Sequence, residues 1–372
     1  MNKLFIVHYY PIEYFPPAMN LINSLEDKLN ITVSSTWKSN SLSEFKGNKV
    51  TIYRNIKEKK SNSSVKTLIK YLIFTVTTLC QLIHKRPNYI LYYESISAFP
   101  VYLYKRFLSP KVKLCIHYHE YMTPSEYERH GMRLSKFNHK YEISYLYRKA
   151  FWISQTNQYR KNFFLNDYPF ILQSNCHILP NYPPQSWHVN KKTHTNNGVI
   201  KCVYVGSLSL HDTYIKEFCQ WIAEQKGKVQ FDIYSFNFYT DTLIAIEKLE
   251  CPYIKFHKEG VKYSDIPNLF THYDVGVLLY KAHTMNVQYC ETNKFYEYLI
   301  CGLDVWYPKE MTLLHEIDKS IFAPQIVEMD IQNGLFPKLD FSLKTVDNSF
   351  YNRTCEKEYE SFIHIIGNID NI

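Results

Sequence analysis

The stretch Asn293-Lys-Phe-Tyr-Glu-Tyr-Leu-Ile-Cys-Gly-Leu-Asp-Val305 is the part of the chain on which the prediction of the fold depends. Its apolar residues recur at helical spacing and predict a short helix with one apolar face: Phe295, Leu299 and Ile300. Gly302 is expected to end this helix, because glycine readily adopts the left-handed conformation of a C-cap. Residues 305–307 then predict a strand that Pro308 stops.

The first turn of this helix combines side chains that suit a nucleoside diphosphate. Asn293 or Thr292 can cap the helix, and Lys294 beside a helix N-terminus can hold a pyrophosphate. Glu297 follows one turn later, where its two acceptor oxygens can bind the paired hydroxyls of a ribose. The same residues also fit a plainer interpretation, a surface Lys294–Glu297 pair worth about 0.2–0.5 kcal/mol. As a surface residue, Glu297 should tolerate alanine with a change below about 1 kcal/mol in the free energy of unfolding.

This stretch resembles the donor-binding helix of retaining nucleotide-sugar glycosyltransferases with the GT-B fold, of the group 1 or family 4 type. The family pattern is Pro-x-Lys-x-x-Glu-Tyr-Leu-x-x-Gly-x-Pro-Val. The chain keeps its Lys, Glu-Tyr-Leu, Gly and Val, whereas Thr292 and Asp304 replace the two prolines. The resemblance implies an α/β protein with the GT-B fold, in which two Rossmann-like, doubly wound parallel-sheet domains face a cleft. It also implies that Asn293, Lys294 and Glu297 bind the nucleotide-sugar donor.

The resemblance is continuous over residues 199–308. Val205-Gly206-Ser207-Leu208 resembles the first turn of the family's donor domain, where glycine lets backbone N–H groups approach a phosphate closely. The family usually has an arginine or lysine soon after this turn, but residues 209–213 contain neither. Lys294 and Lys281 are therefore expected to neutralise the departing diphosphate.

A second candidate site follows the predicted strand 113–117. The resembling enzymes commonly have a His-Asp or His-Glu pair there, which reaches the donor sugar, and His119-Glu120 matches it. A neutral imidazole at His119 could hydrogen-bond a sugar hydroxyl or relay a proton, and a purely structural histidine at a strand end is the alternative. His117 and His119 could also form a metal pair. No further cysteine, histidine or acidic pattern accompanies them, so we predict no metal site.

Alternating apolar strands and amphipathic helices predict a doubly wound parallel sheet. Ile178-Leu-Pro-Asn181 resembles the end of the family's first domain, and residues 182–198 are polar and rich in turn formers, which predicts a linker. We therefore predict an acceptor-binding domain over 1–181 and a donor-binding domain over 199–346. Residues 347–372 predict a closing helix, which the resemblance implies crosses back to the first domain.

Charge is distributed unevenly along the chain. Residues 1–180 contain 25 Lys and Arg against 11 Asp and Glu, a net charge of +14, whereas residues 181–372 have a net charge of −6. A basic first half implies a polyanionic partner, such as an anionic membrane leaflet, a lipid pyrophosphate acceptor or a nucleic acid. Motifs for nucleic-acid recognition are absent from the sequence, so we predict a membrane surface and a lipid-linked saccharide acceptor.

The strongest helical pattern in the chain covers residues 64–84. Nine apolar residues follow the 3.6-residue period: Val65, Leu68, Ile69, Leu72, Ile73, Val76, Leu79, Cys80 and Ile83. Basic residues bracket them, including Lys57, Lys59, Lys60, Lys85 and Arg86. The pattern fits a helix packed on a parallel sheet, and it also fits a helix at a membrane surface whose lysines contact lipid phosphates.

Composition excludes several classes of protein. With ten glycines, the sequence contains neither a Gly-x-Gly-x-x-Gly fingerprint nor a P-loop. It also lacks Asp-x-Asp, which argues against the metal-chelating donor site of the other large glycosyltransferase fold. Nine scattered cysteines and the absence of a signal-peptide pattern predict a cytoplasmic protein, peripheral at the inner face of the plasma membrane.

Taken together, these observations favour a metal-independent glycosyltransferase of surface polysaccharide biosynthesis. It would move a hexosyl-type sugar, with retention, from a nucleotide sugar to the acceptor, and would need no cofactor. Two other functions remain open: a sugar-nucleotide epimerase that uses His119 and Glu120 as acid and base, and a nucleotide-sugar-binding protein without turnover.

Overall fold

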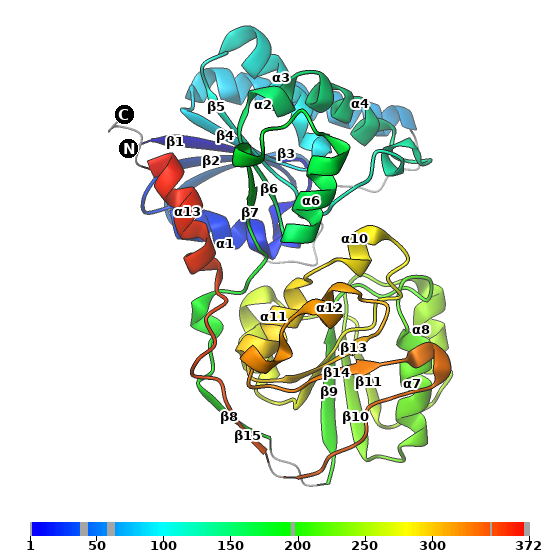
Figure 1. The fold of residues 1–372 in the computed structure, drawn as a ribbon. Helices are drawn as coiled ribbons and strands as arrows, with labels where there is room; N and C mark the ends of the chain where they lie inside the picture. Colours follow the sequence, from blue (N-terminus) through cyan, green and yellow to red (C-terminus); the bar gives the residue numbers. More distant parts are fainter. Residues whose placement is uncertain (1, 38–43, 58–63, 195–197, 343, 368–372) are drawn as a thin grey trace. The chain divides into compact units, whose positions relative to one another are not determined.

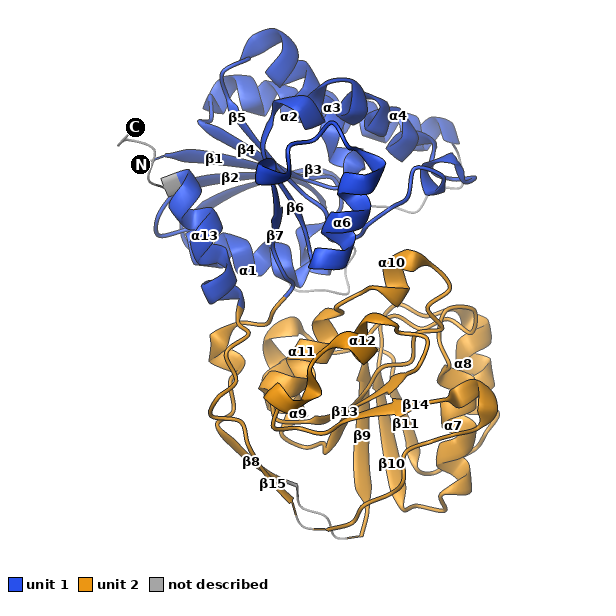
Figure 2. Cartoon of the chain, in the orientation of Figure 1, with its two compact units in different colours: residues 1–181, 355–372 blue, residues 182–354 orange. Residues whose placement is uncertain are grey.

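The computed structural model describes residues 2–37, 44–57, 64–194, 198–342 and 344–367. The chain forms two compact units, which Figure 2 shows in different colours. Unit 1 comprises residues 1–181 and 355–372, and unit 2 comprises residues 182–354. Each unit is built on one parallel β-sheet with helices on its faces (Figure 1), so the protein belongs to the α/β class, as predicted.

Unit 1 contains a seven-stranded sheet with the order β3-β2-β1-β4-β5-β6-β7, in which all neighbours are parallel. The strands are β1 (Lys3–His8), β2 (Asn30–Trp37), β3 (Val50–Lys57), β4 (Tyr89–Tyr93), β5 (Lys113–His117), β6 (Ala150–Gln155) and β7 (Cys176–Ile178). Successive strands are added outward in one direction from β1 and in the other from β4. The strand order therefore reverses between β1 and β4, which places the ends of these two strands at a switch point.

Helices cover both faces of this sheet, because side chains of a strand alternate between its two faces. Phe5 and Val7 of β1 pack in a core with the helices of one layer, and Leu4 and Ile6 pack in a core with those of the other. The first layer contains α2 (Ser64–Lys85), α3 (Ala98–Leu103), α4 (Arg133–Tyr141), α5 (Tyr147–Lys149) and α6 (Gln158–Asp167). The second contains α1 (Pro16–Leu25) and α13 (Cys355–Gly367), which lie side by side in Figure 1.

Several element boundaries in unit 1 differ from the prediction. The tyrosine-rich segment that ends at Lys149 begins as α4 at Arg133 and passes through a π-helical turn, Glu142–Leu146, before α5. The edge strand β3 was not predicted, because its sequence mixes polar and apolar residues and its side chains are only partly buried. β7 has three residues, which is too short to give a periodic pattern.

Unit 2 contains a six-stranded parallel sheet with the order β11-β10-β9-β12-β13-β14. The strands are β9 (Ile200–Val205), β10 (Val229–Tyr234), β11 (Ile254–His257), β12 (Val275–Val277), β13 (Asp304–Pro308) and β14 (Ile326–Met329). The helices are α7 (Ile215–Glu224), α8 (Thr240–Glu247), α9 (Ile266–Phe270), α10 (Met285–Gln288), α11 (Asn293–Ile300) and α12 (Leu313–Glu316). The strand order reverses between β9 and β12, so these strands form the switch point of this sheet.

Residues 182–198, predicted as a linker, belong to unit 2. Within them β8 (Lys191–His194) pairs antiparallel with β15 (Lys344–Asp347), and Trp187 is buried in the core. The ammonium group of Lys192 donates to the carbonyl oxygens of Phe270 and Tyr273 at 2.6 and 2.5 Å. The closing helix is shorter than predicted: α13 begins at Cys355.

The predicted helix at residues 293–300 is confirmed as α11, and two glycines explain its position. At its end Gly302 has φ +75°, and the amides of Gly302 and Leu303 donate to the carbonyls of Leu299 and Tyr298, which is a Schellman motif. Gly276 of β12 gives the helix room to approach the sheet. A Cβ atom at Gly276 would lie 2.1 Å from Cγ of Tyr298, so the tyrosine ring rests directly on the strand backbone.

We expect Gly276→Ala to destabilise unit 2 by about 3 kcal/mol or more, because the added methyl group overlaps a ring that is fully buried. Urea unfolding monitored by tyrosine and tryptophan fluorescence measures this loss. Gly334→Ala is the matched control, since a Cβ atom there would meet no atom within 4 Å and its φ of +70° costs about 1–2 kcal/mol. Equal losses in the two variants would contradict the close packing of α11 on β12.

Candidate functional site

Three of the predicted donor residues lie at the switch point of the unit 2 sheet. Gly206 and Ser207 follow β9 directly, and Lys281 lies in the segment after β12. Strands β9 and β12 are neighbours in the sheet, so both segments leave it at the same edge. In open parallel sheets, ligands bind beyond the carboxyl ends of the strands at such a point.

The turn after β9 is held by hydrogen bonds within unit 2. The amide of Gly206 donates to the carbonyl of Tyr234 at 3.1 Å, so this N–H is already occupied. The Ser207 hydroxyl accepts from the Asn237 side chain at 3.0 Å, and the Ser207 carbonyl accepts from the Tyr204 hydroxyl at 2.7 Å. The Leu208 amide likewise donates to the Asn237 carbonyl at 2.9 Å. A phosphate at this turn would therefore contact the Ser207 hydroxyl more readily than the amides of Gly206 or Leu208.

Lys281 connects the two segments at the switch point. Its ammonium donates to the carbonyl of Leu210 at 2.8 Å and lies 3.7 Å from the carboxylate of Glu217. It also lies 5.3 Å from the centre of the Tyr214 ring. Lys281 thus supplies positive charge beside the turn after β9, but its donors are directed to protein groups in this structure.

Lys294 and Glu297 form an ion pair on the first turn of α11, with 2.5 Å between Nζ and Oε2. The pair is not on the surface, because the side chains are 17% and 1% exposed. This corrects the interpretation as a surface pair, and with it the expectation that Glu297→Ala leaves stability unchanged. Removing one partner of a buried pair costs about 3–5 kcal/mol. Thr292 is the N-cap residue but makes no side-chain capping hydrogen bond.

The second candidate site lies at the switch point of the unit 1 sheet. His119 follows β5, and its ring stacks on Tyr93 and Phe15 with ring centres 4.9 and 5.3 Å apart. The His117 ring meets it edge-on at 4.8 Å, and the His8 ring lies 6.2 Å away. Three histidines from β1, β5 and the segment after β5 therefore share one buried cluster.

These imidazoles are neutral at physiological pH. Burial lowers the pKa of His8 to about 4 and that of His117 to about 3. Burial, together with His117 and His8, lowers the pKa of His119 well below its usual range. Neither ring nitrogen of His119 makes a hydrogen bond of ordinary geometry with a described residue, although the Asn181 side chain is close enough to oppose the fall of its pKa. A buried neutral imidazole with an unused donor and acceptor is suited to bind a hydroxyl group.

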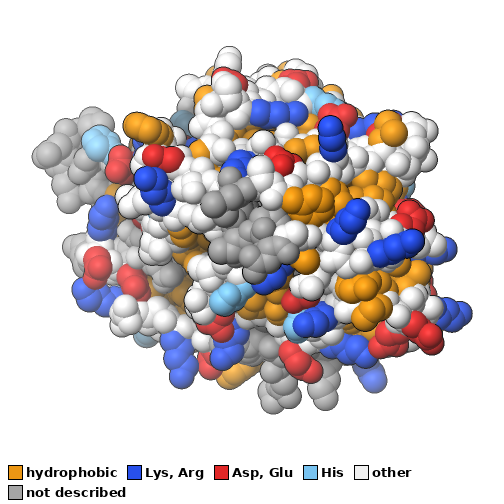
Figure 3. All heavy atoms as spheres, turned by 90° about the horizontal axis from the view of Figure 1, so that it is seen from below, with side chains coloured by type: hydrophobic (Ala, Val, Ile, Leu, Met, Phe, Trp, Pro, Cys, Tyr) orange, Lys and Arg blue, Asp and Glu red, His pale blue; other side chains and the backbone are white. Residues whose placement is uncertain are grey.

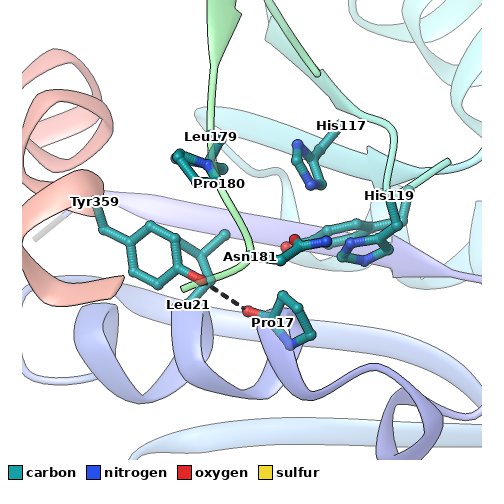
Figure 4. A pocket seen from close by; sticks show the side chains of 9 residues that line it. Pro17, Leu21, His117, His119, Leu179, Pro180, Asn181 and Tyr359 are labelled. Carbon is teal, nitrogen blue, oxygen red and sulfur yellow. Dashed lines mark hydrogen bonds between the residues drawn. The ribbon is translucent and has the colours of Figure 1, made fainter. Parts of the chain in front are cut away.

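His119 lines a narrow pocket of unit 1 (Figure 4). Asn181, from the segment after β7, directs its side chain toward His119, and its carbonyl oxygen also lacks a partner among the described residues. On the other side, Tyr359 of α13 donates from its hydroxyl to the Pro17 carbonyl at 3.1 Å. The pocket thus contains unsatisfied polar atoms, and its walls come from α1 near the start of the chain and from α13 near its end.

Glu120 differs from His119, because its side chain is exposed. It lies on the rim of a second pocket of unit 1, whose walls are mostly tyrosines. Where the described residues are concerned, no group of three or more His, Cys, Asp or Glu side chains is suited to hold a metal ion.

Sequence reasoning missed Glu94, which directly follows β4 at the same switch point. Its carboxylate accepts from the backbone amide of His119 at 2.7 Å. Burial, and next the nearby Glu120, raise the pKa of Glu94 to about 8. Its backbone has φ +60° and ψ 150°, which is unusual for a residue with a side chain. The signal was present in the sequence, since Glu94 directly follows the apolar run 89–93. His119 follows the apolar run 113–117 in a similar way.

Comparison with known proteins gives a likeness of fold. Among protein-family models and curated protein sequences, nothing matches the chain. Several solved structures, however, are similar to it in fold. WaaB, a lipopolysaccharide outer core galactosyltransferase in its apo form, has a TM-score of 0.56 and 11% identity over 90% of this chain and 88% of its own. HepE of Anabaena in complex with UDP-glucose has a TM-score of 0.57 and 11% identity over 88% and 86%.

A trehalose-6-phosphate protein from E. coli bound with UDP-2-fluoro glucose is also similar, with a TM-score of 0.65 and 9% identity over 99% of both chains. At these identities the likeness concerns the arrangement of the two sheets and their helices. The chain therefore has the GT-B fold, as its sequence predicted.

Proposed function

We propose that the protein is a glycosyltransferase that moves a sugar from a nucleoside diphosphate sugar to a saccharide acceptor. The observation that carries the proposal is the buried Lys294–Glu297 pair on the first turn of α11, in a chain with the GT-B fold. A carboxylate that is 1% exposed is costly to bury, and an amphipathic helix does not need one there. Similar structures were solved with UDP or UDP-sugars, which supports such a donor here.

The proposed roles follow from the geometry. Oε2 of Glu297 accepts from Lys294, and Oε1 would accept from a ribose hydroxyl. Lys294 would then contact the diphosphate together with Lys281 and the turn at Gly206 and Ser207. Stabilising the departing diphosphate is the main electrostatic task in such a transfer. His119, neutral and without a partner for its ring among the described residues, would bind a hydroxyl of the transferred hexose or of the acceptor.

Retention of the anomeric configuration and independence of metal ions belong to this proposal. So does the absence of any cofactor besides the donor itself. A nucleotide-sugar-binding protein without turnover is the second candidate, and it is favoured by one observation: Lys281 donates to Leu210 and faces Glu217 rather than a free phosphate site. Release of nucleoside diphosphate from a panel of UDP-, GDP- and dTDP-sugars distinguishes the two functions.

We expect Glu297→Gln to weaken UDP binding at least about tenfold, because the amide keeps the shape of the side chain but loses the charge that pairs with Lys294. Isothermal titration calorimetry with UDP measures this change. Glu316→Gln, on the exposed end of α12, is the control and should bind UDP as the wild type does. Unchanged UDP affinity in Glu297→Gln, with an intact fold by circular dichroism, would refute the donor assignment.

His119→Ala should lower turnover by about 10²–10⁴-fold and change UDP affinity little, because His119 belongs to unit 1 and would act on a sugar hydroxyl. Initial rates of nucleoside diphosphate release with the active donor of the panel test this. His130→Ala, an exposed histidine of the same unit, is the control. Equal rates in wild type and His119→Ala would leave His119 with a structural role only.

A lipid-linked acceptor at the cytoplasmic leaflet, as in surface polysaccharide biosynthesis, is the acceptor that we propose. The support is the outer face of α2. Seven of its apolar side chains are 46–66% exposed: Val65, Leu68, Ile69, Leu72, Ile73, Val76 and Ile83. Apolar patches on this scale in soluble proteins commonly mark interaction surfaces. The inner face of the helix, with Tyr71, Phe74 and Leu82 buried, faces the core of unit 1.

α2 is also long and apolar enough to cross a membrane by length and composition. Its inner face is bound to unit 1, however, since Tyr71 donates to Asn138 at 2.7 Å and Thr78 hydrogen-bonds Ser34 at 2.8 Å. These contacts favour a helix that lies in the membrane interface. Lys66, Lys70 and His84 recur at helical spacing along one edge of the apolar face, and α2 contains no acidic residue. Lys59 and Lys60 lie outside the described residues.

The net charges of the two units agree with a membrane contact through unit 1. Unit 1 has a net charge of +11 and unit 2 of −3 once the acidic closing helix is counted with unit 1. On the face that Figure 3 shows, Lys and Arg side chains are interspersed with Asp and Glu. A basic surface attracts an anionic leaflet by about 1 kcal/mol per lysine, within a Debye length.

The triple variant Leu68→Ser, Leu72→Ser, Val76→Ser should lose binding to anionic vesicles, because it removes the apolar side chains that would enter the interface. Co-sedimentation with phosphatidylglycerol vesicles and with neutral phosphatidylcholine vesicles, at low and high salt, measures it. Ile244→Ser on α8 of unit 2 is the control, with 46% exposure in the wild type. Equal binding by wild type and triple variant, or none by the wild type, would favour a soluble acceptor.

A further inference from the structure

Glu94 occupies a strained position that three hydrogen bonds maintain. Its backbone, at φ +60° and ψ 150°, costs about 1–3 kcal/mol in a residue with a side chain. The Glu94 amide donates to the His117 carbonyl at 3.2 Å, and the Glu94 carbonyl accepts from the Ser97 amide at 3.0 Å. The carboxylate accepts from the His119 amide at 2.7 Å. Such strain persists where the surroundings hold it, and it is concentrated at functional sites.

The backbone of His119 is fixed from both sides by ionisable side chains. Glu94 binds its amide, and Arg160 of α6 donates from Nη1 to its carbonyl oxygen at 2.7 Å. Arg160 is itself 2% exposed and also donates to the Thr156 hydroxyl at 2.8 Å. The His119 ring, by contrast, is held by ring contacts and by the nearby Asn181 side chain, and neither of its nitrogens makes a hydrogen bond of ordinary geometry with a described residue. Its position therefore depends on stacking and on the two backbone hydrogen bonds.

We propose that Glu94 is a positioning residue for His119: its carboxyl group fixes the His119 backbone so that the unpaired imidazole presents its nitrogens to the substrate. This proposal rests on the proposed function, in which His119 binds a sugar hydroxyl. Glu94 acts through His119 and does not itself touch the substrate. A misplacement of about 1 Å at a reacting group can cost on the order of 100-fold in rate.

The protonation state of Glu94 gives the proposal a distinctive readout. With a pKa raised to about 8, the carboxyl group is mostly neutral at pH 7 and still accepts from the His119 amide through its carbonyl oxygen. Above pH 8 it ionises beside Glu120, while Glu142 and Tyr127 also face it and Arg160 lies near His119. Repulsion from Glu120 would then disturb the His119–Glu120 segment, so turnover should fall as the pH rises through about 8.

The test compares Glu94→Ala with Glu94→Gln, which keeps an acceptor oxygen but cannot ionise. Turnover of UDP-glucose, or of the active donor of the panel, should fall about 100-fold in Glu94→Ala with KM changed less than about twofold. Glu94→Gln should keep the rate of the wild type at pH 7 and lack its decline near pH 8. Glu128, in the segment after β5, is an exposed acid, and Glu128→Ala should match the wild type. Full activity in Glu94→Ala, or equal impairment of both variants, overturns the proposal.

A second measurement does not need turnover. The ¹⁵N–¹H resonance of the His119 amide should titrate with a midpoint near pH 8 in the wild type and not in Glu94→Gln, because only the wild-type acceptor changes charge. If the wild type releases no nucleoside diphosphate from any donor, the proposed function fails while this titration still places Glu94 against His119. A His119 amide that does not titrate in the wild type overturns the role of Glu94 even if transfer is observed.

Discussion

The contact between the Tyr298 ring and the bare backbone of Gly276 fixes α11 against β12 in unit 2. The missing side chain lets α11 approach β12 until the ring lies on the strand, and the Tyr298 hydroxyl reaches the carbonyls of Val203 and Val277, each at 3.5 Å. Glu297, the residue before Tyr298 on the same helix, is buried as well. A buried carboxylate must be paired, and Lys294, one turn earlier, is the pairing group. The same short helix thus combines a close packing contact with a buried ion pair.

In unit 1 the polar groups at the switch point are arranged differently from the ion pair of α11. At its switch point the His119 imidazole is neutral and lies between two aromatic rings. Among the described residues, His119 forms no buried ion pair. The two ionisable groups nearby, Glu94 and Arg160, bind the His119 backbone rather than its ring. In this arrangement the neutral Glu94 carboxyl group and the charged Arg160 guanidinium fix the position of the His119 backbone and leave the ring nitrogens unused. An imidazolium there would have two donors and no acceptor, and burial prevents it from forming.

The sequence predicted elements wherever a local pattern decides them. The helix at 293–300 and the fold class are confirmed, and the helix predicted over 64–84 is α2, Ser64–Lys85. The orientation of α2 could not be predicted, because its apolar period looks the same whether that face is buried or exposed. Its buried side instead contains Tyr71 and Thr78, whose hydroxyls find partners on neighbouring elements that only the fold brings close. The burial of Glu297 was unpredictable for the same reason, since the helical pattern does not show which neighbouring elements cover its first turn.

Glu94 shows where sequence reasoning reaches its limit at the site itself. A glutamate after an apolar strand is visible in the sequence, but its partner is the amide of a residue 25 positions away. Only the order of the strands, in which β4 lies between β1 and β5, makes His8, Glu94 and His119 neighbours. The raised pKa of Glu94 follows from the same adjacency, because burial between strands and the charge of Glu120 both oppose its ionisation. A switch point therefore concentrates unusual electrostatics as well as polar side chains: it is where the ends of buried strands expose backbone and side-chain groups that no neighbouring strand can satisfy.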